Sequence, residues 1–283
     1  MDDVSLEEVC DWDFETLLHH AEAGLAVAQY HLGCLCDLQP DGAEDAVCWW
    51  QKAAAQGYAA AMNDLGANCE EGRGVEKDES VALEWYRLAA EQANCLGMLN
   101  LGRVYERGIG LPVDKERMVF WYRKAAEQKW CDGEFNLGYC YELGHGVAQN
   151  YALAAYWYGR AAAHGHEEAP LRLGCLYDFG FGVPKDEAKA VHFYRMSAEQ
   201  GIPLAQYNLG CCCELGIGLP VDMEEAHRWY DLACEAGNAD AQYRMALAYR
   251  DGDFGLVPDA EKADYLLKSV AAQGFEPAIN GKE

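Results

Sequence analysis

The stretch AQYNLGCCCELGIGLPVDMEEAHRWYDLACEAG, from Ala205 to Gly237, contains the features that recur along this chain. A glycine after a large apolar residue returns every 36 residues, after one 33-residue step, at Gly33, Gly66, Gly102, Gly138, Gly174 and Gly210, with Ala246 next. Aromatic pairs keep the same spacing, at Trp49-Trp50, Trp85-Tyr86, Trp121-Tyr122, Trp157-Tyr158, Phe193-Tyr194 and Trp229-Tyr230. A period of about 20 to 50 residues is the signature of a repeat solenoid.

Each period is predicted to form two helices joined by a glycine turn. In GEFNLGYCYELG, Gly133, Leu137 and Tyr141 fall four apart on one face of a helix A, and the GHG that follows tolerates the positive φ values that end a helix. An acidic or amide residue then recurs where it can cap a helix B, at Asp78, Asp114, Asn150, Asp186, Asp222 and Asp259. Apolar residues follow at i, i+3, i+4, i+7 and i+8, which predicts an amphipathic helix.

The glycine turns and the aromatic pairs are interpreted as structure and not as ligand sites. A nucleotide-binding glycine loop follows a β-strand, whereas each of these turns follows a predicted helix and lacks both GKS/T and the third glycine of GxGxxG. Aromatic residues at helical spacing in successive repeats are expected in the core. No cofactor site is therefore predicted.

The composition indicates a globular protein with cationic partners. The 283 residues are 51% hydrophobic, and the net charge is −25, which disfavours binding to nucleic acid or anionic lipid. No basic leader and no apolar run of about 18 residues is present, so neither a secretory signal nor a membrane span is expected. We therefore expect a cytoplasmic location.

The thirteen cysteines are expected to be buried free thiols. Their number is odd, and Cys211, Cys212 and Cys213 are consecutive, so a helix would point them about 100° apart. Cys95 and Cys131 share a position in successive repeats, where their Cα atoms should lie about 9 to 10 Å apart, beyond disulfide reach. No paired CxxC and no HExxH is present, so no metal site is predicted.

The repeated stretch resembles a Sel1-like repeat, a relative of the tetratricopeptide repeat. The resemblance implies an all-α, right-handed α/α solenoid of seven helix-turn-helix repeats, at 25–57, 58–93, 94–129, 130–165, 166–201, 202–237 and 238–274. Residues 1–24 are expected to form an acidic segment and a capping half-repeat, and residues 275–283 to begin an incomplete repeat. That end could expose an uncapped face, which is a candidate surface for self-association.

The resemblance implies a function in protein–protein interaction, as a scaffold or adaptor. A cysteine-rich branch of the family is secreted, disulfide-bonded and associated with penicillin binding, and this chain shares with it only the number of cysteines. A hydrolase or penicillin-binding activity of that branch, or the binding of a small ligand or metal, is the alternative. No G-x-S-x-G sequence and no recurrent histidine position supports catalysis, so the chain is not predicted to be an enzyme.

By analogy with tetratricopeptide repeats, one flank of helix A is expected to face a concave groove. Positions are counted from the repeat glycine, with −5, −1 and +3 expected in the core and −3, +1 and +4 on the groove flank. The predicted partner-binding residues are Asp37, Glu70, Glu106, Glu142, Asp178 and Glu214 at +4, Tyr30, Leu99, Phe135, Leu171, Tyr207 and Tyr243 at −3, and Arg103 and Tyr139 at +1. These columns suit a segment that alternates basic residues with apolar anchors. The alternative is that the acidic column is a solvated face.

A third column at −2 contains Asn100, Asn136 and Asn208. These amides could hydrogen-bond a partner's backbone or hold a neighbouring repeat in place. The structural interpretation is favoured.

Overall fold

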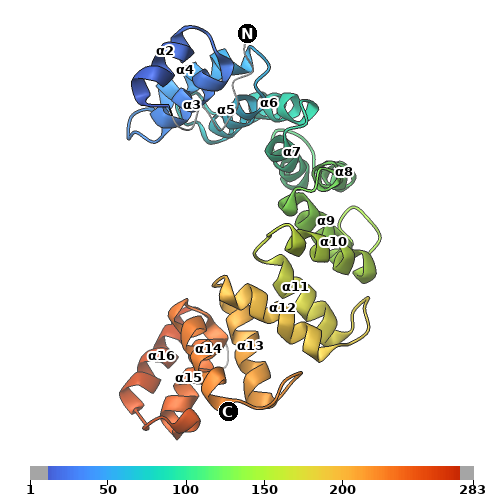
Figure 1. Cartoon of the computed structure of the whole chain (residues 1–283), viewed down its shortest axis with the longest axis vertical. Coiled ribbons are helices and arrows are strands. Elements are labelled where there is room, and N and C mark those ends of the chain that lie inside the picture. The colour runs from blue at the N-terminus through green and yellow to red at the C-terminus, as the bar shows by residue number, and fades with distance from the viewer. Residues whose placement is uncertain (1–11, 275–283) are drawn as a thin grey trace. The chain divides into compact units, whose positions relative to one another are not determined.

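The computed structural model describes residues 12–274, and this range is helical, with no β-strand. The chain divides into two compact units, residues 1–149 and 150–283 (Figure 1). The helices of unit one are α2 (Phe14–Glu22), α3 (Ala26–Asp37), α4 (Ala43–Ala54), α5 (Ala59–Glu71), α6 (Glu79–Glu91), α7 (Cys95–Arg107), α8 (Lys115–Glu127) and α9 (Cys131–Leu143).

Unit two contains the remaining helices. They are α10 (Tyr151–Ala163), α11 (Ala169–Phe179), α12 (Glu187–Glu199), α13 (Pro203–Leu215), α14 (Met223–Glu235), α15 (Ala239–Asp251), the short 3-10 helix η1 (Asp253–Gly255) and α16 (Ala260–Ala272). Within the described range, no helix is long and apolar enough to cross a membrane.

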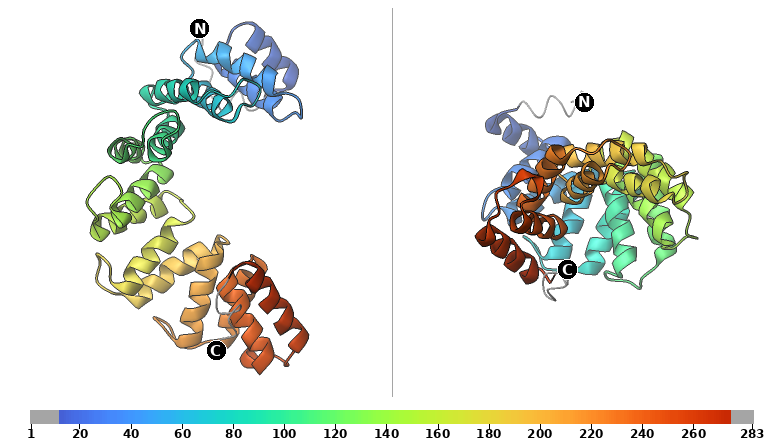
Figure 2. Two further views of the ribbon diagram at one scale, coloured as in Figure 1. Left: turned by 180° about the vertical axis from the view of Figure 1, so that it is seen from behind. Right: turned by 90° about the horizontal axis from the view of Figure 1, so that it is seen from below.

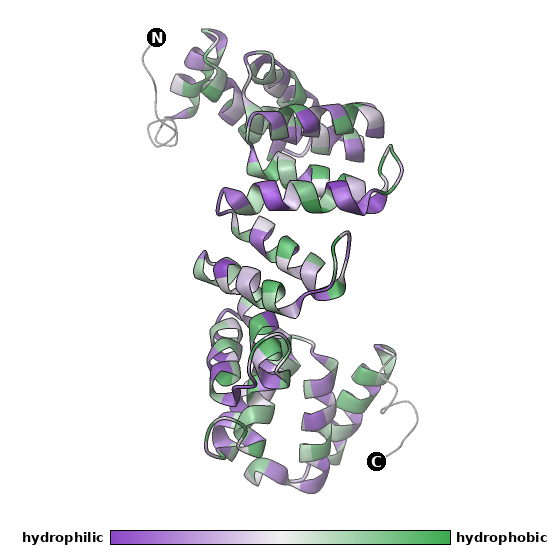
Figure 3. Cartoon of the chain, turned by 90° about the vertical axis from the view of Figure 1, so that its right-hand side faces the viewer, coloured by the Kyte–Doolittle hydropathy of each residue, from purple (hydrophilic) through white to green (hydrophobic). Residues whose placement is uncertain are grey.

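Consecutive helices within each unit pack against one another as a stack of antiparallel pairs (Figure 2). Helix A of a repeat is α3, α5, α7 or α9 in unit one and α11, α13 or α15 in unit two; the even-numbered helices α4 to α16 are the B helices. Hydrophobic and hydrophilic residues alternate around the helices (Figure 3), as expected for helices that bury one face. The predicted helix-turn-helix repeats are confirmed.

The predicted caps of helix B are confirmed. The side chains of Asp78, Asp114, Asn150, Asp186, Asp222 and Asp259 accept hydrogen bonds from backbone N–H groups in the first turn of α6, α8, α10, α12, α14 and α16. These N–H groups have no partner inside the helix, so each cap satisfies donors that would otherwise be unpaired.

The glycine pairs end helix A in the left-handed conformation, as predicted. In the GHG turn, Gly144 has a φ of 72° and Gly146 a φ of 70°. The second glycine has a further role, because a Cβ atom on Gly146 would collide with the backbone carbonyl of Lys115, the first residue of α8. The turn of one repeat therefore packs against helix B of the preceding repeat.

The repeat glycine accommodates the second residue of the aromatic pair. A Cβ atom on Gly66 would lie 2.7 Å from the ring of Tyr86, and one on Gly174 would lie 2.7 Å from the ring of Tyr194. Tyr86 is fully buried, as are the equivalent Tyr158 and Tyr230. The prediction that the aromatic pairs form core is confirmed for the second residue, whereas the first is half-buried in each repeat.

The seventh repeat replaces this glycine and tyrosine together. Ala246 stands at the glycine position, and Leu267 stands eight residues after the cap Asp259, as Tyr230 stands eight residues after Asp222. Leucine lacks the ring that packs over the glycine in the other repeats, so the methyl group of alanine can be accommodated.

One of the three expected core positions of helix A was wrong. Positions −5 and −1 are buried in every repeat, but +3 is buried only at Cys69 and Cys213. Position +2 is buried instead in six of seven repeats. The +3 residue is often a tyrosine whose ring is covered by a cation from the first turn of helix B, as Lys189 Nζ lies 5.1 Å from the ring centre of Tyr177.

Candidate binding face

The predicted partner-binding residues lie along the A helices of both units. In unit one they are Tyr30 and Asp37 on α3, Glu70 on α5, Leu99, Arg103 and Glu106 on α7, and Phe135, Tyr139 and Glu142 on α9. In unit two they are Leu171 and Asp178 on α11, Tyr207 and Glu214 on α13, and Tyr243 on α15. All are half-buried except Leu171, which is buried, and Glu106, which is exposed. We call these residues, within each unit, the candidate face.

The buried tyrosine of helix B donates its hydroxyl to the +4 carboxylate of its own repeat. The O–O distances are 2.9 Å for Tyr86 and Glu70, 3.3 Å for Tyr122 and Glu106, 3.3 Å for Tyr194 and Asp178, and 2.7 Å for Tyr230 and Glu214. Sequence reasoning missed this contact, although the signal was the constant separation of 16 residues between each carboxylate and each tyrosine. These four carboxylates of the acidic column are therefore tied to the core by hydrogen bonds.

Arginines from the following repeat neutralise some of these carboxylates. Arg103 donates through Nη1 and Nη2 to the two oxygens of Glu70, at 2.8 and 2.6 Å. Arg244 binds Glu214 through Nε and Nη2 and lies over the ring of Phe254, with 4.6 Å from Cζ to the ring centre. Arg73 forms an ion pair with Asp37.

The arginine contacts shift the titration of the two glutamates. Burial by itself would raise the pKa of Glu70, but the hydrogen bonds from Arg103 and Tyr86 outweigh it, so the pKa is lowered. The pKa of Glu214 is lowered in the same way, because Arg244 and Tyr230 outweigh burial. Both groups are held in the charged form.

Glu106 and Asp178 differ from these glutamates. Each accepts the tyrosine hydroxyl, but neither forms an ion pair with an arginine or lysine of the described residues. Both carboxylates therefore keep acceptor positions for a cation that residues 12–274 do not supply.

The asparagine at −2 of the third repeat holds neighbouring repeats together, in agreement with the structural interpretation of this residue. Asn100 Nδ2 donates to Asn63 Oδ1 at 2.8 Å, and Asn63 Nδ2 donates to Asp64 Oδ1 at 3.0 Å. Burial raises the pKa of Asp64. These contacts link α5 to α7 across the candidate face of unit one.

An exposed apolar column at +5 was also missed from the sequence. Leu38 is 78% exposed, Phe179 65% and Leu215 66%, and each occupies the last turn or the cap of a helix A. Phe179 stacks on Phe181 at 5.6 Å between ring centres. The signal available in the sequence was a large apolar residue directly after four of the six carboxylates, Asp37, Glu142, Asp178 and Glu214.

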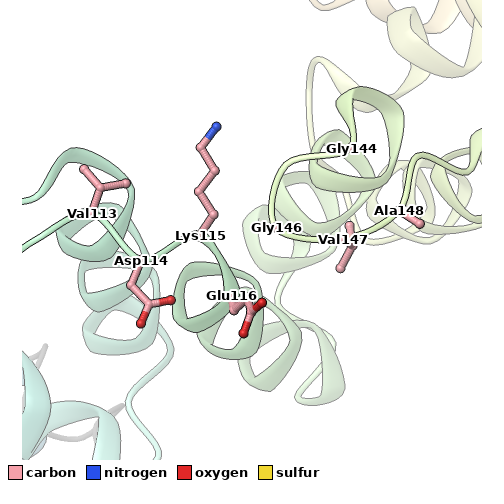
Figure 4. Close-up of a pocket in the computed structure, with 8 residues that line it drawn as sticks. All are labelled: Val113, Asp114, Lys115, Glu116, Gly144, Gly146, Val147 and Ala148. Carbon is pink, nitrogen blue, oxygen red and sulfur yellow. The ribbon is translucent and has the colours of Figure 1, made fainter.

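A shallow hollow lies between the start of α8 and the glycine turn after α9 (Figure 4). It is lined by Val113, Asp114, Lys115, Glu116, Gly144, Gly146, Val147 and Ala148. Asp114 accepts a hydrogen bond from the backbone N–H of Arg117 at 2.9 Å. This N–H group is therefore not available to bind an anion in the hollow. The Lys115 side chain is directed away from the turn in Figure 4. The hollow is a consequence of repeat packing.

The twelve cysteines within residues 12–274 are free thiols. Burial raises the pKa of Cys140 and of Cys212 to about 12, which keeps these thiols protonated and unreactive. Among the described residues, no group of three or more His, Cys, Asp or Glu is placed to hold a metal ion. The cytoplasmic location stays a prediction.

The comparisons with known proteins agree with this architecture. The model of the Sel1 repeat family matches residues 26–58, 59–94, 96–130, 131–166, 168–202, 203–238 and 239–275. A protective antigen of uropathogenic Escherichia coli with an SLR fold is 33% identical over 95% of this chain, with a TM-score of 0.85; the match spans 58% of that longer chain. A Sel1 repeat protein from Oxalobacter formigenes is 36% identical over 86% of this chain and 96% of its own, with a TM-score of 0.76. No curated protein matched. With seven matching repeats and this fold, the chain belongs to the Sel1 repeat family.

Proposed function

We propose that this protein is a non-catalytic scaffold or adaptor that binds a basic, partly apolar partner segment in a groove lined by its A helices. Sel1 repeat proteins generally mediate protein–protein interactions. The proposal adds the chemistry of the partner and the place where it docks.

The observation that supports the proposal is the set of contacts made by the carboxylates of Glu106 and Asp178. A tyrosine hydroxyl fixes each carboxylate, and within residues 12–274 no ion pair neutralises it. A carboxylate accepts up to about four hydrogen bonds, so one hydroxyl orients it and leaves room for a cation. Holding such groups rigidly before binding reduces the ordering cost that binding has to overcome.

The −3 column supplies the apolar part of the contact. Leu99 lies on α7 together with Glu106, and Tyr207 lies on α13, the A helix that follows the one with Asp178; both side chains are half-buried. Half-buried apolar side chains beside charges favour a segment in which basic and apolar residues alternate. The net charge of −25 favours a cationic partner and disfavours nucleic acid.

The proposal is tested by capture of partners from native lysate with the full chain as bait, at about 50 mM and 300 mM salt. The test variant changes Glu106 and Glu142 to Gln and Asp178 to Asn. The matched control changes Glu84, Glu127 and Glu199, three exposed residues of B helices, to Gln.

Partners of the candidate face should be basic, should weaken with salt, and should be lost from the test variant but retained by the control. Synthetic peptides that contain the basic segments of those partners should bind with the same dependence. Partners that bind both variants equally would overturn the proposal.

A further inference from the structure

The chain's own arginines show which cation the +4 carboxylates accept. Arg103 meets Glu70 with two parallel hydrogen bonds, of 2.8 and 2.6 Å, while Tyr86 donates to the same carboxylate. Arg244 likewise reaches Glu214 from two of its nitrogens while Tyr230 donates to it. A guanidinium group presents a planar fork that matches a carboxylate, whereas the lysine ammonium is a single point of charge.

Asp178 has the same arrangement without the arginine. It accepts the hydroxyl of Tyr194, and Cys211 follows it by 33 residues, just as Arg103 follows Glu70 by 33 residues. The nearby Lys185 is engaged elsewhere, since its Nζ lies 2.8 Å from Glu187. Asp178 is therefore a carboxylate in the arginine-binding position whose internal arginine is replaced by cysteine.

Exposed apolar side chains stand next to this carboxylate. Phe179 is 65% exposed and stacks on Phe181, which is 48% exposed. Leu215 occupies the position equivalent to Phe179 in the next repeat and is 66% exposed. Exposed apolar side chains that recur beside a charge on a strongly acidic protein mark a docking surface for a partner that carries both positive charge and apolar groups.

We infer that this surface, Asp178 with Tyr194, Phe179, Phe181 and Leu215, binds an arginine of the partner segment. The guanidinium group pairs with Asp178 as Arg103 pairs with Glu70, and large apolar residues flanking the arginine pack on Phe179 and Leu215. The inference rests on the proposed function and makes it more specific. It states that the basic residue of the partner is arginine and not lysine, and that this arginine binds to unit two. A second copy of this chain is not expected to bind here, because two chains that each carry a net charge of −25 repel one another.

The inference is tested with a random-peptide phage library selected on the full chain. The selected peptides should be enriched in arginine over lysine, with large apolar residues beside the arginine. A synthetic peptide from this selection should lose about tenfold in affinity when its arginine is changed to lysine. Fluorescence anisotropy of the labelled peptide gives both dissociation constants.

The site is located by variants of the chain. Asp178→Asn should weaken the arginine peptide about tenfold and abolish its preference over the lysine peptide, and Asp178→Glu should restore both. Glu199→Gln, at an exposed position on α12, removes the same charge and should change neither. In Cys211→Arg, the new arginine should pair with Asp178, as Arg103 pairs with Glu70, and so prevent the peptide from binding. Thermal unfolding followed by circular dichroism shows whether this variant is folded.

The outcomes separate the inference from the proposed function. Failure to select any basic peptide would overturn both. Peptides in which lysine and arginine are equivalent would overturn the inference alone. Arginine peptides that bind Asp178→Asn as tightly as the unchanged protein would also overturn the inference, because they would bind elsewhere.

Discussion

Repeats two and five have the same internal design but a different outside partner. In both, a glycine lies under a tyrosine ring, Gly66 under Tyr86 and Gly174 under Tyr194, and the tyrosine hydroxyl reaches a carboxylate. In repeat two the next repeat supplies an arginine to that carboxylate; in repeat five it supplies a cysteine. One residue in the neighbouring repeat therefore decides whether the carboxylate has an arginine of the chain as its partner.

The shared part of the two repeats should respond equally to mutation, with the largest effect on stability. Gly66→Ala and Gly174→Ala would each place a methyl group 2.7 Å from a tyrosine ring. Each should destabilise the protein by about 2 to 3 kcal/mol, because a well-packed interior accommodates an added methyl only by strain. Urea denaturation followed by circular dichroism measures the loss.

The seventh repeat provides the control for this prediction. Ala246 and Leu267 occur there together, so the double variant Gly66→Ala with Tyr86→Leu should be more stable than the sum of the two single effects predicts. Additive losses would contradict the view that the glycine makes room for the ring.

The fold could be predicted because the same sequence pattern occurs in seven successive repeats. The spacing of the recurring residues predicted the helix pairs, the N-caps such as Asp186, and the glycines with left-handed backbone conformation such as Gly144. The candidate face could be predicted only in part, because 100° per residue places a side chain on a flank without naming its partner. The contacts of Glu70 with Tyr86 and Arg103 join residues 16 and 33 positions apart, and their geometry depends on how helices stack.

The carboxylates of the two repeats should differ in their effect on stability. Glu70→Gln should cost about 1.5 to 2 kcal/mol, because it leaves the half-buried Arg103 without its charged partner. Asp178→Asn should change stability by no more than about 0.5 kcal/mol, because no lysine or arginine of the described residues forms an ion pair with it. Equal losses in urea denaturation would remove the distinction between the two repeats.

The cost of Glu70→Gln should depend on pH. The folded-state pKa of Glu70 lies below its ordinary value, so its stabilisation is complete above about pH 4.3 and is lost as the pH falls through the folded-state pKa. The difference in unfolding free energy between the unchanged protein and the variant should therefore shrink from pH 6 toward pH 3, by at most about 2 kcal/mol. A constant difference across that range would show that Glu70 acts through packing and not through its charge.

Removal of a tyrosine hydroxyl should cost less stability than Glu70→Gln, and it should separate the roles of the two repeats most clearly. Tyr86→Phe should cost about 1 kcal/mol, since it removes a hydrogen bond to a charged group at 2.9 Å from a buried ring. Tyr194→Phe should cost less, because its bond to Asp178 is longer at 3.3 Å and Asp178 has no ion pair within residues 12–274 to keep in place. If the hydroxyl of Tyr194 serves to orient Asp178 for a partner, Tyr194→Phe should weaken the arginine peptide about threefold, whereas Tyr86→Phe should leave its affinity unchanged. The reverse ranking in peptide affinity would transfer the binding role from repeat five to repeat two, where Arg103 would have to leave Glu70 before a partner could enter.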